Sequence, residues 1–348
     1  MNLLAFETSC DETSVAVVSQ GCIRSNVISS QVDLHREYGG VVPELAAREH
    51  LRNLLPVAGE ALRLAGIAPG DLDAIAATRG PGLPSALMVG FKAAQAMSFT
   101  LEVPFVGVHH HEAHLYSPWI VGDPPRADFG AFEPNLSLIV SGGHTLLVHL
   151  LAEGRHRVLG STLDDAAGEC FDKVGKLLGL PYPAGPEIER LAESGDRRAY
   201  DFPRPMLQEA NDDFSFSGLK TSVRYFLRDR PELLDDAKAR RNLCASVQAA
   251  IVEVLAVKTL KAASRIGVRC VTASGGVTCN RTLRQALEQG CRRSGLRWRV
   301  APAGLCTDNA GMIGILAERK LQKPAASEAL VEEVLPSWEM DSLQTNGF

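Results

Sequence analysis

The chain has eight cysteines but no Cys-x-x-Cys pair. This excludes a zinc ribbon and indicates reduced thiols in a reducing compartment. No stretch approaches the roughly 20 uninterrupted apolar residues of a membrane span. No basic region precedes the short apolar strand at the N-terminus, so no signal peptide is expected. The protein is therefore expected in the cytoplasm, with no membrane partner.

A surplus of positive charge is also missing. The formal net charge is −5, so any RNA contact must use local patches or a partner subunit. Arginines gather locally at Arg197, Arg198 and Arg204, and again between Arg292 and Arg299. What is present is an ordinary globular composition, 45 % apolar and 22 % charged, in 348 residues. A chain of this length can bury two substantial cores, which predicts two lobes or domains.

The same pattern of strands and turns occurs twice along the chain. Three consecutive strands are predicted in each half, at 3–8, 13–19 and 22–29 and again at 136–140, 145–151 and 157–162. Each triplet is followed by helical segments that alternate with short apolar strands, which predicts two α/β lobes of similar plan. Two duplicated lobes whose turns face a central cleft are typical of the actin-like superfamily of actin, Hsp70 and sugar kinases (ASKHA). We therefore predict an actin-like α/β fold.

The predicted first lobe spans residues 1–130 and the second spans residues 131–308. Residues 121–134 are rich in Gly, Asp and Pro and show little periodicity, which suits a linker between the lobes. The final helix, at about 309–321, is expected to pack back on the first lobe.

Four of the nine histidines lie within the six residues His109-His110-His111-Glu112-Ala113-His114. In a helix, His110 and His114 project from one face and can bridge one divalent ion. A third ligand must come from elsewhere, and Asp308 offers a hard, short carboxylate. The alternative is a polar helix start whose histidines cap the helix and face solvent. The clustering favours the metal site.

The spacing of the same run disfavours a metallopeptidase. A zincin needs His-Glu-x-x-His, and His111-Glu112-Ala113-His114 is one residue too short. The metallopeptidase stays an alternative because Glu112 can act as a base beside a metal-bound water.

Three glycine-rich turns follow apolar strands. Ser141-Gly142-Gly143 and Ser274-Gly275-Gly276 let backbone N–H groups converge on an anion, which suits a phosphate or a nucleoside. Arg79-Gly80-Pro81-Gly82 precedes a helix and is expected to shape the rim of the cleft.

Polar residues near these turns are candidates for ligand contacts. Asp165, Glu169 and Asp172 share one face of a predicted helix. Either this face is solvated, or it lines the cleft and holds ribose hydroxyls or a substrate ammonium. Asn280 follows the second turn and can read a base or a hydroxyl through both of its amide functions.

Nine segments, spread in order over essentially the whole chain, match the motifs of one family: 6–13, 38–44, 109–114, 140–144, 171–173, 182–186, 214–220, 274–280 and 306–311. They resemble the TsaD/Gcp family of tRNA adenosine threonylcarbamoyltransferases, in its bacterial branch. The chain departs from the family pattern at three positions. His111 stands where relatives often have Met, and Ala113 and Ala184 stand where Gly is common.

The resemblance implies transfer of threonylcarbamoyl from threonylcarbamoyl-AMP to the N6 amine of the adenosine 3′ to the anticodon. The tRNAs concerned read codons that begin with A, and the products are t6A and AMP. By motif position, one ion, Fe2+ with Zn2+ as the alternative, is held by His110, His114 and Asp308. Partner proteins of the TsaB and TsaE families are also implied. Substrate contacts are assigned to Ile139, Val140, Ser141, Gly142, Gly143, Asp172, Gly185 and Asn280.

This chemistry fits the residue types. Two imidazoles and one carboxylate leave open positions on an ion for oxygens of the acyl donor. Backbone donors at Ser141-Gly142-Gly143 can stabilise the AMP leaving group. No general base is identified, and His144 and Glu12 are the candidates. Two other classes stay open, an actin-like nucleotide-binding scaffold that needs no metal ligands and a metallopeptidase that needs no nucleotide turns.

Overall fold

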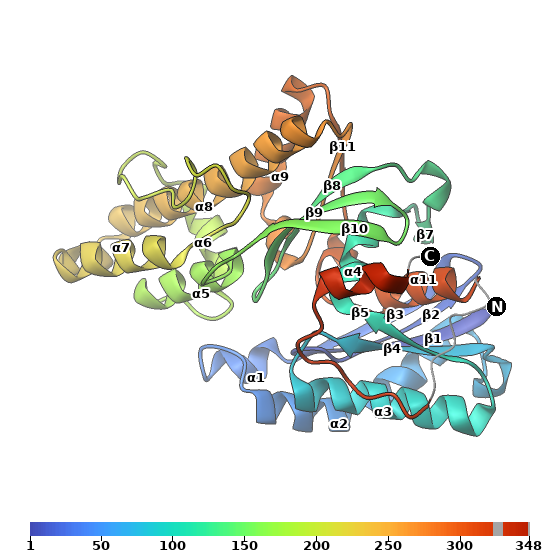
Figure 1. Cartoon of the computed structure of the whole chain (residues 1–348). Helices are drawn as coiled ribbons and strands as arrows, with labels where there is room; N and C mark the ends of the chain where they lie inside the picture. The colour runs from blue at the N-terminus through green and yellow to red at the C-terminus, as the bar shows by residue number, and fades with distance from the viewer. Residues whose placement is uncertain (323–329, 347–348) are drawn as a thin grey trace. The chain divides into compact units, whose positions relative to one another are not determined.

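Two β-sheets organise the chain, each in a unit of its own (Figure 1). The computed structural model describes residues 1–322 and 330–346. Unit 1 comprises Met1–Phe132, Glu153–Arg155 and Ala301–Phe348, and unit 2 comprises Glu133–Ala152 and His156–Val300. The chain thus returns to unit 1 at residue 301, earlier than the predicted limit of 308. Asp308 belongs to unit 1.

The sheet of unit 1 has the strand order β5-β4-β1-β2-β3-β7-β6. An antiparallel meander of β1, β2 and β3 adjoins the parallel strands β4 and β5. β1, β4 and β5 read as continuous apolar runs because helices cover both of their faces. The strands are β1 (Asn2–Glu7), β2 (Glu12–Ser19), β3 (Cys22–Ser30), β4 (Ala74–Gly80), β5 (Phe105–His109), β6 (Ile120–Val121) and β7 (Arg126–Ala127).

Helices α2 and α3 cover one face of this sheet, and α11 and α4 lie on the other (Figure 1). Leu4 and Phe6 point into a core shared with α2 and α3, whereas Ala5 and Val18 face Gly314 of α11. The helices are α1 (Val32–Arg36), α2 (Pro43–Ala65), α3 (Pro84–Leu101), α4 (His110–Tyr116), α10 (Ala303–Cys306) and α11 (Ala310–Leu321), with 3-10 turns at Pro69–Asp71, Ser117–Trp119, Phe129–Ala131 and Met340–Asn346.

The sheet of unit 2 repeats that of unit 1. Its strand order β12-β11-β8-β9-β10 corresponds one by one to β5-β4-β1-β2-β3, with β8 antiparallel to β9 and parallel to β11. The duplication predicted from the sequence is therefore confirmed. The strands are β8 (Asn135–Val140), β9 (Thr145–Ala152), β10 (Arg155–Ser161), β11 (Cys270–Ser274) and β12 (Arg297–Val300).

Helix α8 forms the centre of the unit 2 core. Asp236 caps its first turn through the amides of Lys238 and Ala239, and Gly267, at φ +72°, ends it. α8 is long and apolar enough to cross a membrane, but 78 % of its most apolar window is buried inside the protein, as in a core helix. The helices are α5 (Ala167–Leu177), α6 (Ala184–Ala192), α7 (Ser217–Arg228), α8 (Ala237–Ile266) and α9 (Arg281–Arg293), with 3-10 turns at Pro231–Leu234 and Gly276–Cys279.

The segment predicted as a linker, 121–134, contains the boundary between the units at residues 132 and 133, but its first half belongs to the unit 1 sheet. β6 and β7 pair with each other, and β7 adds to the edge of the unit 1 sheet beside β3. Ile23 N donates to Pro125 O and Ala127 N donates to Gly21 O, at 2.9 and 2.8 Å. Strands of two residues are too short to show a period of two, so the sequence pattern did not reveal them.

Two glycines in helix interiors give opposite expectations for substitution by alanine. A Cβ on Gly314 would lie 2.6 Å from Val18 Cγ2 and 3.2 Å from Ala5 Cβ, whereas a Cβ on Gly59 of α2 would meet nothing. Gly314→Ala should therefore destabilise the protein by about 1–3 kcal/mol through overpacking. Gly59→Ala should stabilise it by about 0.5–1 kcal/mol. Denaturant unfolding of both variants measures this, and shifts of the same sign would contradict the packing argument.

Candidate metal centre and ligand-binding loops

Three parallel strands of unit 1 end side by side, and polar residues of the candidate centre lie at these ends. Because β1, β4 and β5 are neighbours that run in one direction, their carboxyl ends share one edge of the sheet. Glu7 ends β1, Thr78 lies near the end of β4, and His110 follows β5. Thr78 and His110 both bind the carboxylate of Glu7. Glu7 Oε2 accepts from Thr78 Oγ1 at 2.5 Å and from His110 Nδ1 at 2.9 Å.

The structure brings His110, His114 and Asp308 together within unit 1. Each offers one ligand atom, and these atoms lie within 4.8 Å of one another. Asp308 Oδ1 is 3.4 Å from His110 Nε2 and 3.1 Å from His114 Nε2. The histidines are one helical turn apart on α4, and Asp308 comes from the segment that leads into α11. His111, between the two histidines, is not a member of this group.

Glu7 orients His110, and the sequence analysis gave it no role. Its carboxylate accepts from His110 Nδ1 and, at 2.5 Å, from the amide of Ser9. With Nδ1 donating to Glu7, the nitrogen left to bind an ion after losing its proton is Nε2, which faces Asp308. A carboxylate on the outer nitrogen is the usual device for fixing the tautomer of a metal-binding histidine. A fully buried Glu at the end of an apolar strand was the available signal.

The ionisable groups of the candidate centre shift one another's pKa values. Burial opposes the imidazolium form of His110, but the charges of Asp308 and Glu7 outweigh burial and raise the pKa of His110 well above its ordinary value. Burial alone would raise the pKa values of Glu7 and Asp308, whereas their interactions with His110 hold both below the ordinary range. For His114, burial dominates and lowers the pKa. The carboxylates of Glu7 and Asp308 thus favour a positive charge on His110, which lies between them.

Glu112 is not placed to serve as the base of a metallopeptidase. Its Oε2 accepts from Lys320 Nζ of α11 at 2.7 Å, and its side chain is nearly fully buried in that ion pair.

Glu12 is also unsuited to act as a general base. Burial, together with the charges of Asp11 and Asp308, raises the pKa of Glu12 to about 9. A carboxyl group with this pKa already carries its proton at neutral pH and therefore does not take up the proton of the amine. Its Oε1 accepts from Ser30 Oγ at 2.8 Å.

In unit 2, both glycine-rich turns lie at the carboxyl ends of adjacent parallel strands. β8 ends at Val140 and β11 at Ser274, and Ser274 pairs with Ile139. Gly275 has φ +91°, and a Cβ there would collide with the carbonyl of Val140. A Cβ on Gly168, in the first turn of α5, would lie 2.5 Å from Ser141 O. Such an edge, where backbones approach closely, is where α/β sheets usually bind ligands.

The turn between β8 and β9 presents two exposed glycines. Ser141 N donates to His144 O, and His144 N donates to Ser141 Oγ, so these two amides serve the turn itself. Gly142 and Gly143 are exposed, and a Cβ on either would meet nothing within 4 Å. Their N–H groups are the ones that the turn offers to an anion.

The other predicted substrate residues have structural contacts of their own. Asp172 of α5 accepts from Ala184 N at 2.7 Å, which fixes the start of α6 beside Gly185. Asn280 caps α9 by accepting from Leu283 N, and its Nδ2 donates to Gln248 Oε1 at 2.7 Å. Two of the four hydrogen bonds that the side chain of Asn280 can make are thus used within the protein.

The acidic face that the sequence predicted around α5 is neutralised. Lys173 pairs with Asp165 and Glu169, and Lys220 pairs with Asp165. Asp165 is buried and precedes the helix. Asp165 links α5 to α7 through Lys220, whereas Glu169 pairs with Lys173 within α5 and keeps about two fifths of its side chain exposed.

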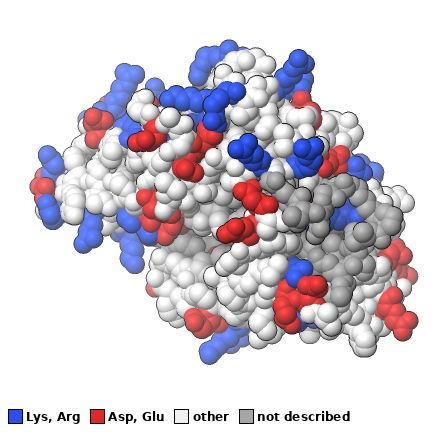
Figure 2. Space-filling model, viewed as in Figure 1, with Lys and Arg blue, Asp and Glu red and all other residues white. Residues whose placement is uncertain are grey.

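Basic residues are concentrated in unit 2. This unit holds 24 of the 36 Lys and Arg residues but only 19 of the 41 Asp and Glu residues. On the face shown in Figure 2, Lys and Arg side chains lie over α7 and α9. Unit 2 therefore carries a net positive charge within a chain whose total is negative.

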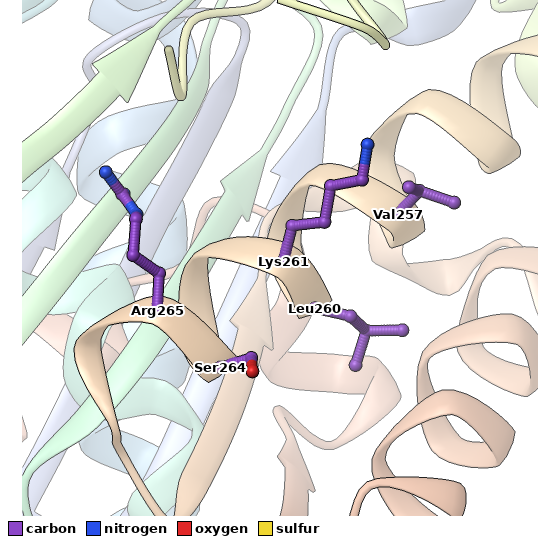
Figure 3. A pocket seen from close by; sticks show the side chains of 5 residues that line it. All are labelled: Val257, Leu260, Lys261, Ser264 and Arg265. Atoms are coloured by element: carbon purple, nitrogen blue, oxygen red, sulfur yellow. The ribbon is translucent and has the colours of Figure 1, made fainter. Parts of the chain in front are cut away.

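A hollow of about 470 Å³ lies on α8, lined by Val257, Leu260, Lys261, Ser264 and Arg265 (Figure 3). The two basic side chains that line the hollow already have partners within the protein. Lys261 Nζ donates to Leu207 O, and Arg265 pairs with Asp212. None of the predicted site residues lines it.

Comparisons with known proteins identify the family. The family model described as "TsaD: tRNA N6-adenosine threonylcarbamoyltransferase" matches residues 22–315. A protein of that name from Syntrophotalea carbinolica is 47 % identical over 342 residues, 98 % of this chain and 97 % of the relative. Another from Chlorobium luteolum is 50 % identical over 331 residues, covering 93 % and 94 %.

The chain belongs to the TsaD family. It is thus a transferase, as the sequence motifs predicted, and tRNA is the substrate that the family name implies.

Solved structures of low sequence identity show the fold. HypF of T. kodakarensis superposes with a TM-score of 0.60 at 15 % identity, over 92 % of this chain and 48 % of that one. The component A of (R)-2-hydroxyglutaryl-CoA dehydratase from Acidaminococcus fermentans gives 0.52 at 15 % identity, over 93 % and 100 %. The predicted actin-like fold is confirmed.

We expect His110→Ala and His114→Ala each to remove a ligand. Loss of an outer partner alone typically weakens metal binding about 10- to 100-fold, so loss of either histidine should cost at least that. His111→Gln is the matched control, because this neighbour lies outside the group, and it should keep its metal. Elemental analysis and competition titration with a chromophoric chelator measure the effect. Full metal content in the His114 variant would contradict the ligand set.

Metal affinity should rise with pH. His110 has a raised pKa and keeps its proton above the range of an ordinary imidazole, so an ion must displace that proton. Asp308 and His114 have lowered pKa values and release no proton near neutrality. Between pH 6 and 8, affinity should grow up to about tenfold per pH unit, with one proton released per ion. Calorimetry in buffers of different ionisation enthalpy counts that proton, and pH-independent affinity would refute the argument.

Proposed function

We propose that this chain transfers the threonylcarbamoyl group of threonylcarbamoyl-AMP to the N6 amine of the adenosine 3′ to the anticodon. Its substrates would be tRNAs that read codons beginning with A, and its products t6A and AMP. The observation that carries the proposal is the His110, His114 and Asp308 group in a chain of the TsaD family. An actin-like scaffold without covalent chemistry has no need of these three residues.

The donor set suits a divalent ion, and we propose Fe2+, with Zn2+ as the alternative. Two neutral imidazoles and one carboxylate are borderline ligands that both ions accept. Asp308, with about a fifth of its side chain exposed, is the open side of an otherwise buried group. Such an ion, when bound, supplies Lewis-acid polarisation of the acyl donor. His110, His114 and Asp308 would hold it, and Glu7 would fix the tautomer of His110.

The predicted substrate residues of unit 2 suit the adenylate part of the donor. Ile139, Val140, Ser141, Gly142 and Gly143 form the carboxyl end of β8 and the turn that follows it. The amides of the two exposed glycines can bind the phosphate and stabilise it as a leaving group. The remaining three are also proposed to contact the donor: Asp172, Gly185 and Asn280. Asp172 and Asn280 in addition fix the starts of α6 and α9.

The reaction is a substitution at the carbamoyl carbon. The N6 nitrogen forms a bond to this carbon, the bond from the carbon to the phosphate oxygen breaks, and AMP leaves with the electron pair. The N6 nitrogen then loses one proton. Because a nitrogen on an aromatic ring is a weak nucleophile, activation of the donor matters more than deprotonation of the amine. The catalytic base stays unassigned.

The positive charge of unit 2 supports a role for this unit in binding tRNA. Arg197 and Arg198 are exposed and suit phosphate contacts. Arg204 and Arg297 are less suitable, because they already pair with Glu253 and Glu133. Because the net charge of the chain is −5, we propose that partner proteins supply part of the affinity for tRNA. The proposed partners are proteins of the TsaB and TsaE families, and the proposed location is the cytoplasm.

The test is reconstitution. The purified chain, the two partner proteins with ATP, threonylcarbamoyl-AMP and unmodified tRNA are combined, and nucleosides and AMP are quantified. We expect t6A and AMP in equal amounts. Asp308→Asn should slow the reaction at least about a hundredfold, since several kcal/mol of charge stabilisation correspond to two or more powers of ten. Asp33→Asn, in an exposed ion pair of the same unit, is the matched control.

Two results would contradict the proposal. Release of AMP without t6A would make the chain a hydrolase of the adenylate. Full activity of the Asp308 variant would show that the reaction needs no metal centre at these residues.

A further inference from the structure

A segment near the C-terminus, residues 332–338, lies along α3 and the end of β4, and we name it the strap. Gln95 Nε2 donates to Glu332 O at 2.9 Å, and Lys92 pairs with Glu333 at 3.0 Å. Leu335 N donates to Arg79 O at 2.8 Å, and Gly82 N donates to Pro336 O at 3.1 Å. All of these contacts lie within unit 1. The strap is thus fixed by backbone and side-chain contacts along its length.

Arg79 binds the strap through its side chain, and Gly80 leaves the space into which the strap packs. The guanidinium of Arg79 pairs with Glu332, donates from Nε to Glu333 O at 2.8 Å, and lies 5.6 Å from the ring of Trp338. A Cβ on Gly80 would collide with the carbonyl of Leu335. The glycine-rich turn at 79–82 thus has a structural use that the sequence analysis did not foresee. It receives the strap.

The strap ends on His109, the residue before the first metal ligand. The two rings of His109 and Trp338 lie 4.9 Å apart, and His109 Nε2 is 3.1 Å from Trp338 O. His109 Nδ1 accepts from Glu112 N at 3.3 Å and so caps α4. A carbonyl only accepts and an amide only donates. Both contacts form together only in the tautomer that carries its hydrogen on Nε2.

The 79–82 loop also contacts Ser9, which in turn lies beside His110. A Cβ on Gly82 would lie 2.6 Å from Ser9 O, and Leu83 N donates to Ser9 O at 2.8 Å. Ser9 Oγ in turn lies 3.3 Å from His110 Nδ1. The strap therefore connects to the first turn of α4 by two routes, through His109 and through Ser9.

We infer that the strap positions the metal ligands. By holding the tautomer and orientation of His109, residues 332–338 fix the start of α4 and with it the register of His110 and His114 against Asp308. Trp338, Arg79 and Gly80 are positioning residues in this scheme, and none of them touches an ion. The inference rests on the proposed metal centre.

The test uses Co2+ as probe in the full chain. Gly80→Ala should displace the strap by collision, and Arg79→Ala should release it by removing its contacts with Glu332, Glu333 and Trp338. Hydrogen exchange of the peptides that contain residues 332–340 reports release, and Co2+ affinity and its visible d–d spectrum report the centre. Affinity should fall about two- to thirtyfold, the range for loss of one helix cap.

Matched controls exist on the same unit. Gly70→Ala meets no atom within 4 Å, and Arg63 is an exposed arginine paired with Glu60 on α2. Gly70→Ala and Arg63→Ala should leave strap exchange, Co2+ affinity and the spectrum at wild-type values.

A rescue experiment separates positioning from general stability. Asn is a favoured capping residue, so His109→Asn should keep the cap of α4 and most of the Co2+ affinity. His109→Leu fills similar space without a cap and should lose affinity and alter the d–d spectrum. Equal affinity of the Asn and Leu variants would overturn the route through His109.

Three further outcomes would overturn either the inference about the strap or the metal centre on which it rests. Faster exchange of the strap with unchanged Co2+ affinity would show that the strap only stabilises the fold and would overturn the inference. Weaker Co2+ binding without faster strap exchange would overturn it as well, because the effect would come from another part of unit 1. Absence of Co2+ binding in the wild-type chain would instead overturn the metal centre itself.

Discussion

The hydrogen bond between Glu7 and His110 is the contact on which the chemistry of unit 1 depends. Glu7 is completely buried, and a buried carboxylate is costly unless it is paired and hydrogen bonded. Thr78, the amide of Ser9 and His110 satisfy it. They do so because three parallel strands end at one edge of the sheet. The same ion-pair geometry leaves the other nitrogen of His110 directed at Asp308.

Much of the fold follows from local sequence. Alternation and apolar runs located the three strands of each half, and Pro43 and Gly66 are local signals that delimit α2. The order of the strands follows from the duplication. The sequence also predicted that the final helix packs back on the first lobe, and α11 contacts β1 and β2 there. Its contact with Ala5 and Val18 depends on Gly314, whose missing side chain carries no periodic signal.

The candidate centre was predictable only in part. Two histidines four residues apart on a helix define a shared face by geometry alone. Asp308 was suggested by its chemistry, although the predicted domain limits assigned it to the other lobe. Glu7 was missed because a single carboxylate in an apolar strand gives no spacing to interpret. Asn280 was predicted as a reader of base or hydroxyl, and its amide also caps α9 and binds Gln248, contacts that the sequence did not reveal.

The path of the chain through the two units has a consequence for biosynthesis. A ribosome releases the strands of unit 1 and the two histidines first, then the whole of unit 2, and only afterwards Asp308 and α11. Until that point one face of the first sheet, with Ala5 and Val18, lacks its cover. A nascent chain can therefore neither cover this face of the sheet nor bring Asp308 to the two histidines. The proposed metal centre can therefore form only after unit 2 has been synthesised.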